Sequence, residues 1–166
     1  YNCFVALNLD ADQTVHFQVR HYNAEKGTGV ISVTVGLIED DHGNTWETAT
    51  PFAHGGDNPG SIDVAGDNDF FAVEISSAGA YAFGTTTLEE STVDTLCALF
   101  GLEGEELVAA SEENDDRVSR EDLNCRIEHS FDAPTTAYFR VAHWERDVQA
   151  PANRGDYQVY VERPAD

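Results

Sequence analysis

Hydrophobic and polar residues alternate in short runs along most of the chain. The runs are FQV at 17–19, VISVTV at 30–35, FFAVEI at 70–75, AYAFGT at 80–85, FRV at 139–141 and YQVYV at 157–161. A period of two places successive side chains on opposite faces of a strand, so each run predicts a β-strand. Clusters rich in Gly, Asn and Asp separate the runs. This spacing predicts an all-β, jelly-roll-like antiparallel β-sandwich.

One stretch, LEGEELVAASEE at 102–113, is also compatible with a helix. Gly104 stands near its start, and its neighbours along the chain are predicted strands. Because glycine is unfavourable within a helix and common in turns, we favour a strand with a turn over a helix.

The chain contains an internal repeat. Residues 2–22 (NCFVALNLDADQTVHFQVRHY) align with residues 124–144 (NCRIEHSFDAPTTAYFRVAHW) with eight identities in twenty-one positions. After a slip of four residues, GVISVTV at 29–35 aligns with GDYQVYV at 155–161. The repeated unit is the size of a domain and is longer than a solenoid repeat.

The repeat predicts three parts. Residues 1–38 match the last strands of an incomplete preceding copy, 39–59 form an acidic linker, and 60–166 form a complete sandwich domain. The linker is polar and contains Gly and Pro, as linkers commonly do. The sequence lacks Met and begins at Tyr1, so we expect a processed or excised piece of a longer protein.

Charge narrows the function classes. Thirty-one Asp and Glu oppose nine Lys and Arg, for a formal net charge of −22. Such a surface repels phosphate backbones and anionic lipid, which argues against nucleic-acid and membrane-surface binding. It attracts cations, so a calcium role and simple solubility both remain open. The apolar runs are too short for a transmembrane helix.

Several short motifs, in order, resemble the bacterial pre-peptidase C-terminal domain family. They are Gly-Asp-x-Asp-Phe (Gly66 to Phe70), Gly-x-Tyr-x-Phe (Gly79 to Phe83), Asp-Thr-Leu (Asp94 to Leu96), a turn at Gly104, Asn-Asp-Asp (Asn114 to Asp116) and a closing Gly-x-Tyr-x-x-x-Val (Gly155 to Val161). The resemblance covers roughly 39–162. It implies a jelly-roll-like sandwich that serves secreted proteins as a non-catalytic accessory module.

The related collagen-binding domains of clostridial collagenases bind calcium where the linker meets the first strands. By position, the resemblance implies a Ca²⁺ ligand set drawn from two segments. The implied ligands are Glu39, Asp41, Asn44, Asp67 and Asp69. Calcium prefers six to eight hard oxygen ligands. A purely structural interpretation of Asp67 and Asp69 as turn-forming residues also remains open.

A second acidic group, Asp94 with Asn114, Asp115 and Asp116, is a candidate for another cation, with solvated turn residues as the alternative. The three cysteines are Cys3, Cys97 and Cys125. Cys97 and Cys125 lie on predicted strands that a sandwich can bring together, and a disulfide between them fits an oxidising, extracellular setting. Cys3 is the repeat counterpart of Cys125, so its partner belongs to the missing part of the first copy.

Exposed aromatic residues are candidates for contact with a partner. Tyr22 and Trp144 are repeat equivalents, and Trp46 in the linker either packs onto the sandwich or meets a partner. The sequence carries no metalloprotease, P-loop, dinucleotide-binding or nucleophile-elbow motif, so we expect no enzyme. Two functions remain: an accessory module that binds extracellular polymer or neighbouring copies, or a repeating subunit of an extracellular filament or surface array assembled by strand addition.

Overall fold

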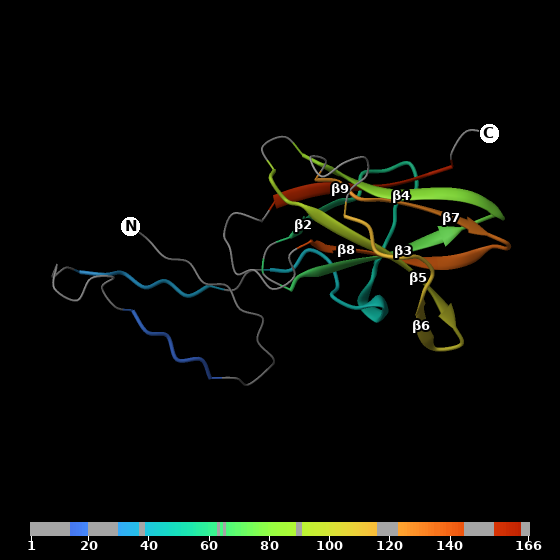
Figure 1. Cartoon of the computed structure of the whole chain (residues 1–166). Helices are drawn as coiled ribbons and strands as arrows, with labels where there is room; N and C mark the ends of the chain where they lie inside the picture. Colours follow the sequence, from blue (N-terminus) through green and yellow to red (C-terminus); the bar gives the residue numbers. More distant parts are fainter. Residues whose placement is uncertain are drawn as a thin grey trace.

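The computed structural model describes residues 14–19, 30–36, 39–62, 64, 66–88, 91–115, 123–144 and 155–163. Within them the chain forms two β-sheets, one of five strands and one of four, packed face to face (Figure 1). The predicted β-sandwich is therefore confirmed.

The five-stranded sheet has the order β1-β3-β8-β5-β6. Its strands are β1 (Thr50–Pro51), β3 (Asn68–Ile75), β8 (Thr135–His143), β5 (Thr95–Glu103) and β6 (Glu106–Ala109). The β1–β3 pair is parallel, and the other pairs are antiparallel. Strand β8 thus lies in the middle of its sheet, between β3 and β5.

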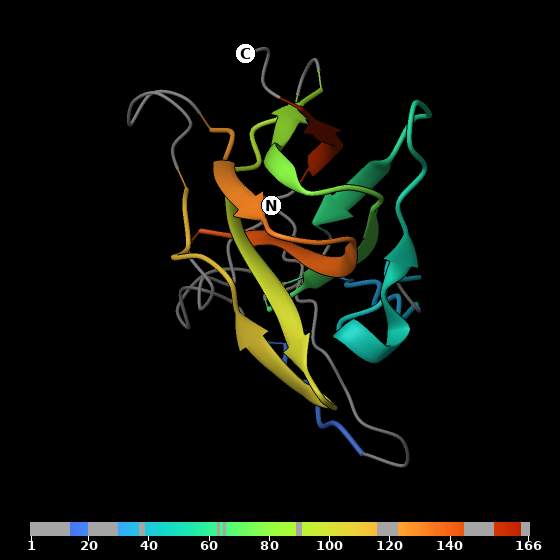
Figure 2. The same ribbon diagram turned by 90° about the vertical axis from the view of Figure 1, so that its right-hand side faces the viewer.

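The four-stranded sheet has the order β2-β9-β4-β7 and is antiparallel throughout. Its strands are β2 (Pro59–Ile62), β9 (Gly155–Glu162), β4 (Gly79–Thr87) and β7 (Arg126–Phe131). Strand β9 is held on both sides, by β2 and β4. Figure 2 shows this sheet above the five-stranded one, with the β5–β6 hairpin pointing away from it.

In β3, β8 and β9, alternate residues face the core between the sheets. In β3 and β8 these are Phe71, Val73, Phe139 and Val141, all at most 1% exposed. The Phe139 ring lies 5.7 Å, centroid to centroid, from Phe83 of β4 in the opposite sheet. The alternation read from the sequence is therefore the inward and outward alternation of real strands.

The stretch 102–113 forms the end of β5, a turn and β6. Gly104 occupies that turn with a φ of 69°, a left-handed conformation that glycine adopts at little cost. The preference for a strand with a turn is confirmed.

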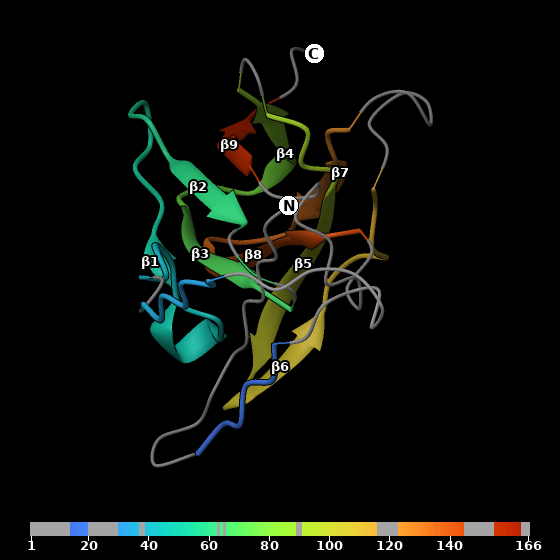
Figure 3. The ribbon, with the colours of Figure 1, turned by 90° about the vertical axis from the view of Figure 1, so that its left-hand side faces the viewer.

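The acidic stretch 39–59 packs against the sandwich. It forms the short 3₁₀-helix η1 (Trp46–Thr48) and β1, which lies at the edge of the sheet beside β3 (Figure 3). The Phe52 N–H donates to the Ala72 carbonyl at 2.9 Å, and the Phe70 N–H donates to the Gly43 carbonyl at 3.1 Å. This stretch therefore adds a strand to the sheet as well as linking two parts of the chain.

The predicted strands at 17–19 and 30–35 behave differently. Residues 14–19 and 30–36 pair with no strand among the described residues, and both extend to one side of the sandwich in Figure 1. Their hydrophobic side chains are exposed, with Phe17 at 54% and Val35 at 90%. A segment with the sequence pattern of a strand but no neighbouring strand cannot form the backbone hydrogen bonds of a sheet. In the described part of the chain, no helix has the length and apolarity to cross a bilayer.

Candidate metal centre

The turn before β3 brings two aspartates into the interior. Gly66 has a φ of 81°, and the Asn68 side chain donates to the Gly66 carbonyl at 2.7 Å. The turn is followed directly by Asp67, which is 4% exposed, and by Asp69, which is 0% exposed. Asp69 shares the inward face of β3 with Phe71 and Val73, so the period of the strand itself buries this carboxyl group.

A third carboxylate reaches the same place from the acidic stretch. The Asn44 side chain donates to Asp40 Oδ2, and its own Oδ1 accepts the Asn68 N–H at 3.0 Å. The backbone N–H of His42 donates to Asp40 Oδ1 at 3.3 Å. Asn44 therefore connects Asp40 to the start of β3.

His42 fixes the acidic stretch to both sheets. Its Nε2 lies 2.7 Å from the Pro59 carbonyl of β2, so this nitrogen carries the proton. Its Nδ1 lies 2.8 Å from the Thr50 hydroxyl of β1. The ring lies 4.4 Å from the Phe71 ring. These contacts place the neighbouring aspartates over the end of the core.

Asp69 is the most perturbed group of the site. The Tyr157 hydroxyl of β9 donates to its Oδ2, whereas its buried Oδ1 accepts no hydrogen bond from the residues that the structure describes. Burial raises the pKa of Asp69 to about 8, opposed by the Tyr157 hydrogen bond and reinforced by the charges of Asp67, Asp41 and Asp40. Burial, followed by the charge of Asp69, also raises the pKa of Tyr157. Gly60 of β2 leaves the space that the Tyr157 ring needs, because a Cβ there would collide with it.

Asp40, Asp67 and Asp69 together form the candidate metal centre. One oxygen of each lies within 4.8 Å of the others, a span that fits opposite sides of an ion with Ca–O distances of about 2.3–2.6 Å. The donors are hard carboxylate oxygens, which suit calcium and magnesium. A cation here would neutralise clustered charge and give Asp69 Oδ1 a partner.

The five ligand positions implied by the resemblance fall in three places. Asp67 and Asp69 belong to the metal centre. Asn44 holds Asp40, and the charge of Asp41 contributes to the raised pKa of Asp69. Glu39 is exposed and is not one of the three grouped carboxylates. Sequence reasoning missed Asp40, because only the turn geometry decides which of three consecutive acids faces the sandwich.

In the second acidic group, Asn114 makes hydrogen bonds to two neighbouring segments of the sandwich. Its backbone exchanges two hydrogen bonds with Cys97, at 2.8 and 3.0 Å, and its Oδ1 accepts the Arg126 N–H at 3.1 Å. Asp94 and Asp115 are half-buried, and Asp116 lies outside the described residues. In the described ranges the three carboxylates of the metal centre are the one such group, so Asp94 and Asp115 form no comparable cluster.

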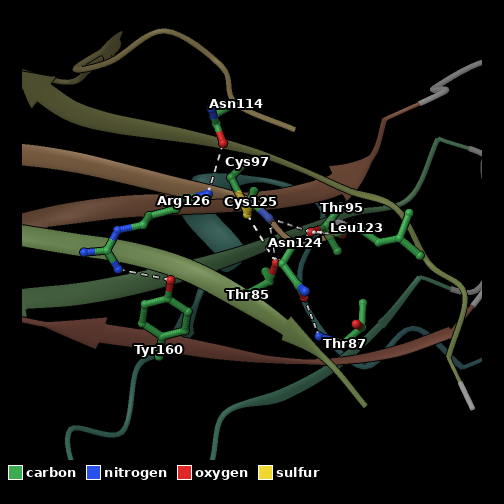
Figure 4. Close-up of a disulfide and its surroundings, with 10 residues drawn as sticks. All are labelled: Thr85, Thr87, Thr95, Cys97, Asn114, Leu123, Asn124, Cys125, Arg126 and Tyr160. Carbon is green, nitrogen blue, oxygen red and sulfur yellow. Dashed lines mark hydrogen bonds between the residues drawn. A yellow bond between two sulfur atoms is a disulfide. The ribbon is translucent and has the colours of Figure 1, made fainter. Parts of the chain in front are cut away.

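The predicted disulfide between Cys97 and Cys125 is confirmed, with a Cα–Cα distance of 5.8 Å. It lies in the core, where the Cys125 N–H is within 3.2 Å of the hydroxyls of both Thr85 and Thr95 (Figure 4). The bond connects β5 in one sheet to the start of β7 in the other. Cys3 lies outside the described residues.

The aromatic residues proposed for partner contact differ in their surroundings. Trp46 is half-buried and packs edge-on against Tyr138 of β8, with ring centroids 5.6 Å apart, so it fastens the acidic stretch onto the sandwich. Trp144 is 50% exposed at the end of β8 and remains available to a partner. Tyr22 lies outside the described residues.

Neither a protein-family model nor a curated protein sequence matches the chain. Solved structures share its fold. The surface-associated copper-binding protein CorA of Methylomicrobium album BG8 is 11% identical with a TM-score of 0.52, over 70% of this chain and 98% of that one. The pre-peptidase C-terminal domain of the Bacillus anthracis collagenase is 12% identical with a TM-score of 0.46, over 76% of this chain and 100% of that one.

A third similar structure is PliG of Aeromonas hydrophila, a periplasmic inhibitor of g-type lysozyme. It is 13% identical with a TM-score of 0.44, over 69% of this chain and 96% of that one. At these identities the likeness concerns the β-sandwich fold alone.

Proposed function

We propose that this chain is a non-catalytic accessory module of a secreted or cell-surface protein, and that Ca²⁺ locks its acidic stretch onto the sandwich. The observation that carries the proposal is the buried carboxyl group of Asp69. Among the described residues its Oδ1 has no hydrogen-bond donor, and one of its oxygens lies within 4.8 Å of an oxygen of Asp40 and of Asp67. A buried charge of this kind is costly unless a proton or a cation compensates it. Calcium binding would remove that cost.

The donor set favours calcium over copper. Copper sites use imidazole, thiolate or thioether ligands, whereas the three grouped side chains are all carboxylates. The nearby His42 ring already uses both nitrogens, on Thr50 and Pro59. CorA is described as copper-binding, but that property has no corresponding donors in this cluster.

An oxidising compartment is supported by the Cys97–Cys125 disulfide, because such bonds persist mainly outside the cytosol. The strong negative charge suits calcium-rich surroundings and argues against anionic partners. The exposed Trp144 ring offers a contact for an extracellular polymer or a neighbouring module.

The test is thermal unfolding of the full chain in chelator, in calcium and in magnesium. At a calcium concentration 100 times the Kd, we expect about 2.7 kcal/mol of stabilisation and a rise of roughly 10 °C in the midpoint. Asp69→Asn should abolish this increment. In chelator the same variant should be at least as stable as the parent, because it removes the cost of keeping this buried carboxyl group protonated above its ordinary pKa.

Asp132→Asn is the matched control, since Asp132 is an exposed acid in the turn between β7 and β8. It should retain the full calcium increment. A parent protein whose midpoint is the same in calcium and in chelator would reject the metal centre. An equal loss in Asp69→Asn and Asp132→Asn would mean that calcium acts only through overall charge.

A further inference from the structure

The two segments outside the sandwich, residues 14–19 and 30–36, carry the pattern of interior strands. By the repeat alignment, 14–19 match 136–141 in β8 and 30–36 match 156–162 in β9. In the sandwich, β8 lies between β3 and β5, and β9 lies between β2 and β4. Neither strand is an edge strand, so the sequence of each is adapted to neighbours on both sides.

The correspondence holds residue by residue in the first segment. Val15, Phe17 and Val19 are exposed at 46%, 54% and 38%. Their counterparts in β8 are Ala137, Phe139 and Val141, which are all 0% exposed and face the core. All six residues of 14–19 are exposed, and these three are the positions that a sandwich buries.

The second segment follows the same rule. Ile31 and Val33 are exposed at 64% and 52%, whereas their counterparts Tyr157 and Val159 in β9 are 0% and 2% exposed. Between them, Ser32 matches Gln158, which is half-buried on the outer face. The two segments, whose counterparts lie in opposite sheets, therefore both have the pattern of core-facing residues expected of strands in one sandwich.

We propose that residues 1–38 are the closing third of a second sandwich, and that a further copy of the region 39–122, joined ahead of them in the same polypeptide, covers their apolar faces. That region supplies β1–β6, including the β2, β3, β4 and β5 neighbours that β8 and β9 require. It also supplies a counterpart of Cys97 to pair with Cys3, as Cys97 pairs with Cys125.

A second molecule of the same chain fits this surface less well. In its sandwich, β8 and β9 already occupy the positions that 14–19 and 30–36 would take. If 14–19 and 30–36 entered the sandwich of a second molecule, they would displace its β8 and β9, so no additional apolar surface would be buried. The partner must therefore bring the β1–β6 part without a β8 and β9 of its own.

The test is a chain in which an additional copy of residues 39–122 is joined directly before Tyr1 of the full chain. Hydrogen exchange should slow by more than about 100-fold at the amides of 14–19 and 30–36 relative to the unfused chain. Reactive thiols should fall from one to zero per molecule, although a cysteine has been added. Unprotected amides together with two reactive thiols would overturn the proposal.

Two variants of the fused chain distinguish a specific fit from general collapse. Phe17→Asp, at the counterpart of buried Phe139, should remove the new protection. Gln18→Asp, at the counterpart of the outward-facing Arg140, should retain it. Equal protection in both variants would contradict a sandwich in this register. So would an unfused chain that dimerises by analytical ultracentrifugation with 14–19 and 30–36 protected.

Discussion

Residues 14–19 and the matching residues 136–141 of strand β8 share three of six residues and the same alternation, but lie in opposite surroundings. Phe139 is fully buried between the sheets, while Phe17, at the matching position, is 54% exposed. The difference lies in the neighbours: β8 has β3 and β5 on its two sides, and the segment has no paired strand in the described part of the chain. An alternating sequence therefore predicts a strand, but the strand forms only where neighbouring strands pair with it.

The same comparison applies to β9 and residues 30–36, where it concerns the metal centre. Tyr157 donates to Asp69, whereas the segment has Ile31 at the matching position, which has no hydroxyl. A second sandwich completed around residues 30–36 would therefore lack this donor. The two copies would share a fold while differing in how they compensate a buried carboxyl group.

The largest expected effect separates Phe139 from Phe17 in the full chain. Phe139→Ala removes a core ring that packs against Phe83, so it should lower the free energy of unfolding by about 3–5 kcal/mol. Phe17→Ala should change it by less than about 0.5 kcal/mol, because the side chain is exposed. Urea unfolding of both variants makes the measurement. Similar losses in the two variants would mean that Phe17 already packs in a core.

The next effect separates Cys125 from its counterpart Cys3. The disulfide closes a loop with a sequence separation of 28, so the double variant Cys97→Ala/Cys125→Ala should lose about 3–4 kcal/mol in the chain-entropy model. Cys3→Ala should leave stability unchanged, because its proposed partner belongs to a further copy. Urea unfolding in the absence of reductant tests both. A marked loss in Cys3→Ala would place that cysteine within the sandwich described here.

The smallest effect concerns Tyr157, where the segment has Ile31. Tyr157→Phe removes the donor to Asp69 and should cost about 1–2 kcal/mol, whereas Ile31→Val should cost almost nothing. Below about pH 8 this cost should be constant, because folded Asp69 stays protonated with or without the donor. Above about pH 8 it should grow, because the lost hydrogen bond favours the charged carboxylate. Urea titrations between about pH 6 and pH 10 in chelator measure it, and a cost that does not grow at the upper end would contradict the contact.

The sign of the underlying pH dependence follows from the pKa of Asp69. Folded Asp69 retains its proton up to about pH 8, whereas the unfolded residue releases it near the ordinary aspartate pKa of 3.8. Between these values the folded protein binds the extra proton. Stability of the calcium-free parent therefore falls as the pH rises, by at most about 1.4 kcal/mol per pH unit. Asp69→Asn should flatten this fall.

The alternation of Phe71 and Val73 along 70–75 was enough to predict a strand, and it became β3. The pairing of Cys97 with Cys125 also followed from the predicted strands. Asp40 did not, since Glu39, Asp40 and Asp41 have the same local character. Only the hydrogen bonds of Asn44 and His42 choose among them.

The sequence by itself determined that this protein is a β-sandwich, that residues 2–22 repeat the pattern of 124–144, and that acids gather before the first strands. These features are local or periodic along the chain, so they can be recognised from the sequence alone. The tertiary structure decided which acid joins Asp67 and Asp69, that Tyr157 lies beside them, and that the acidic stretch adds β1 to a sheet. Each depends on segments far apart in the chain, whose meeting is set by packing of the whole core.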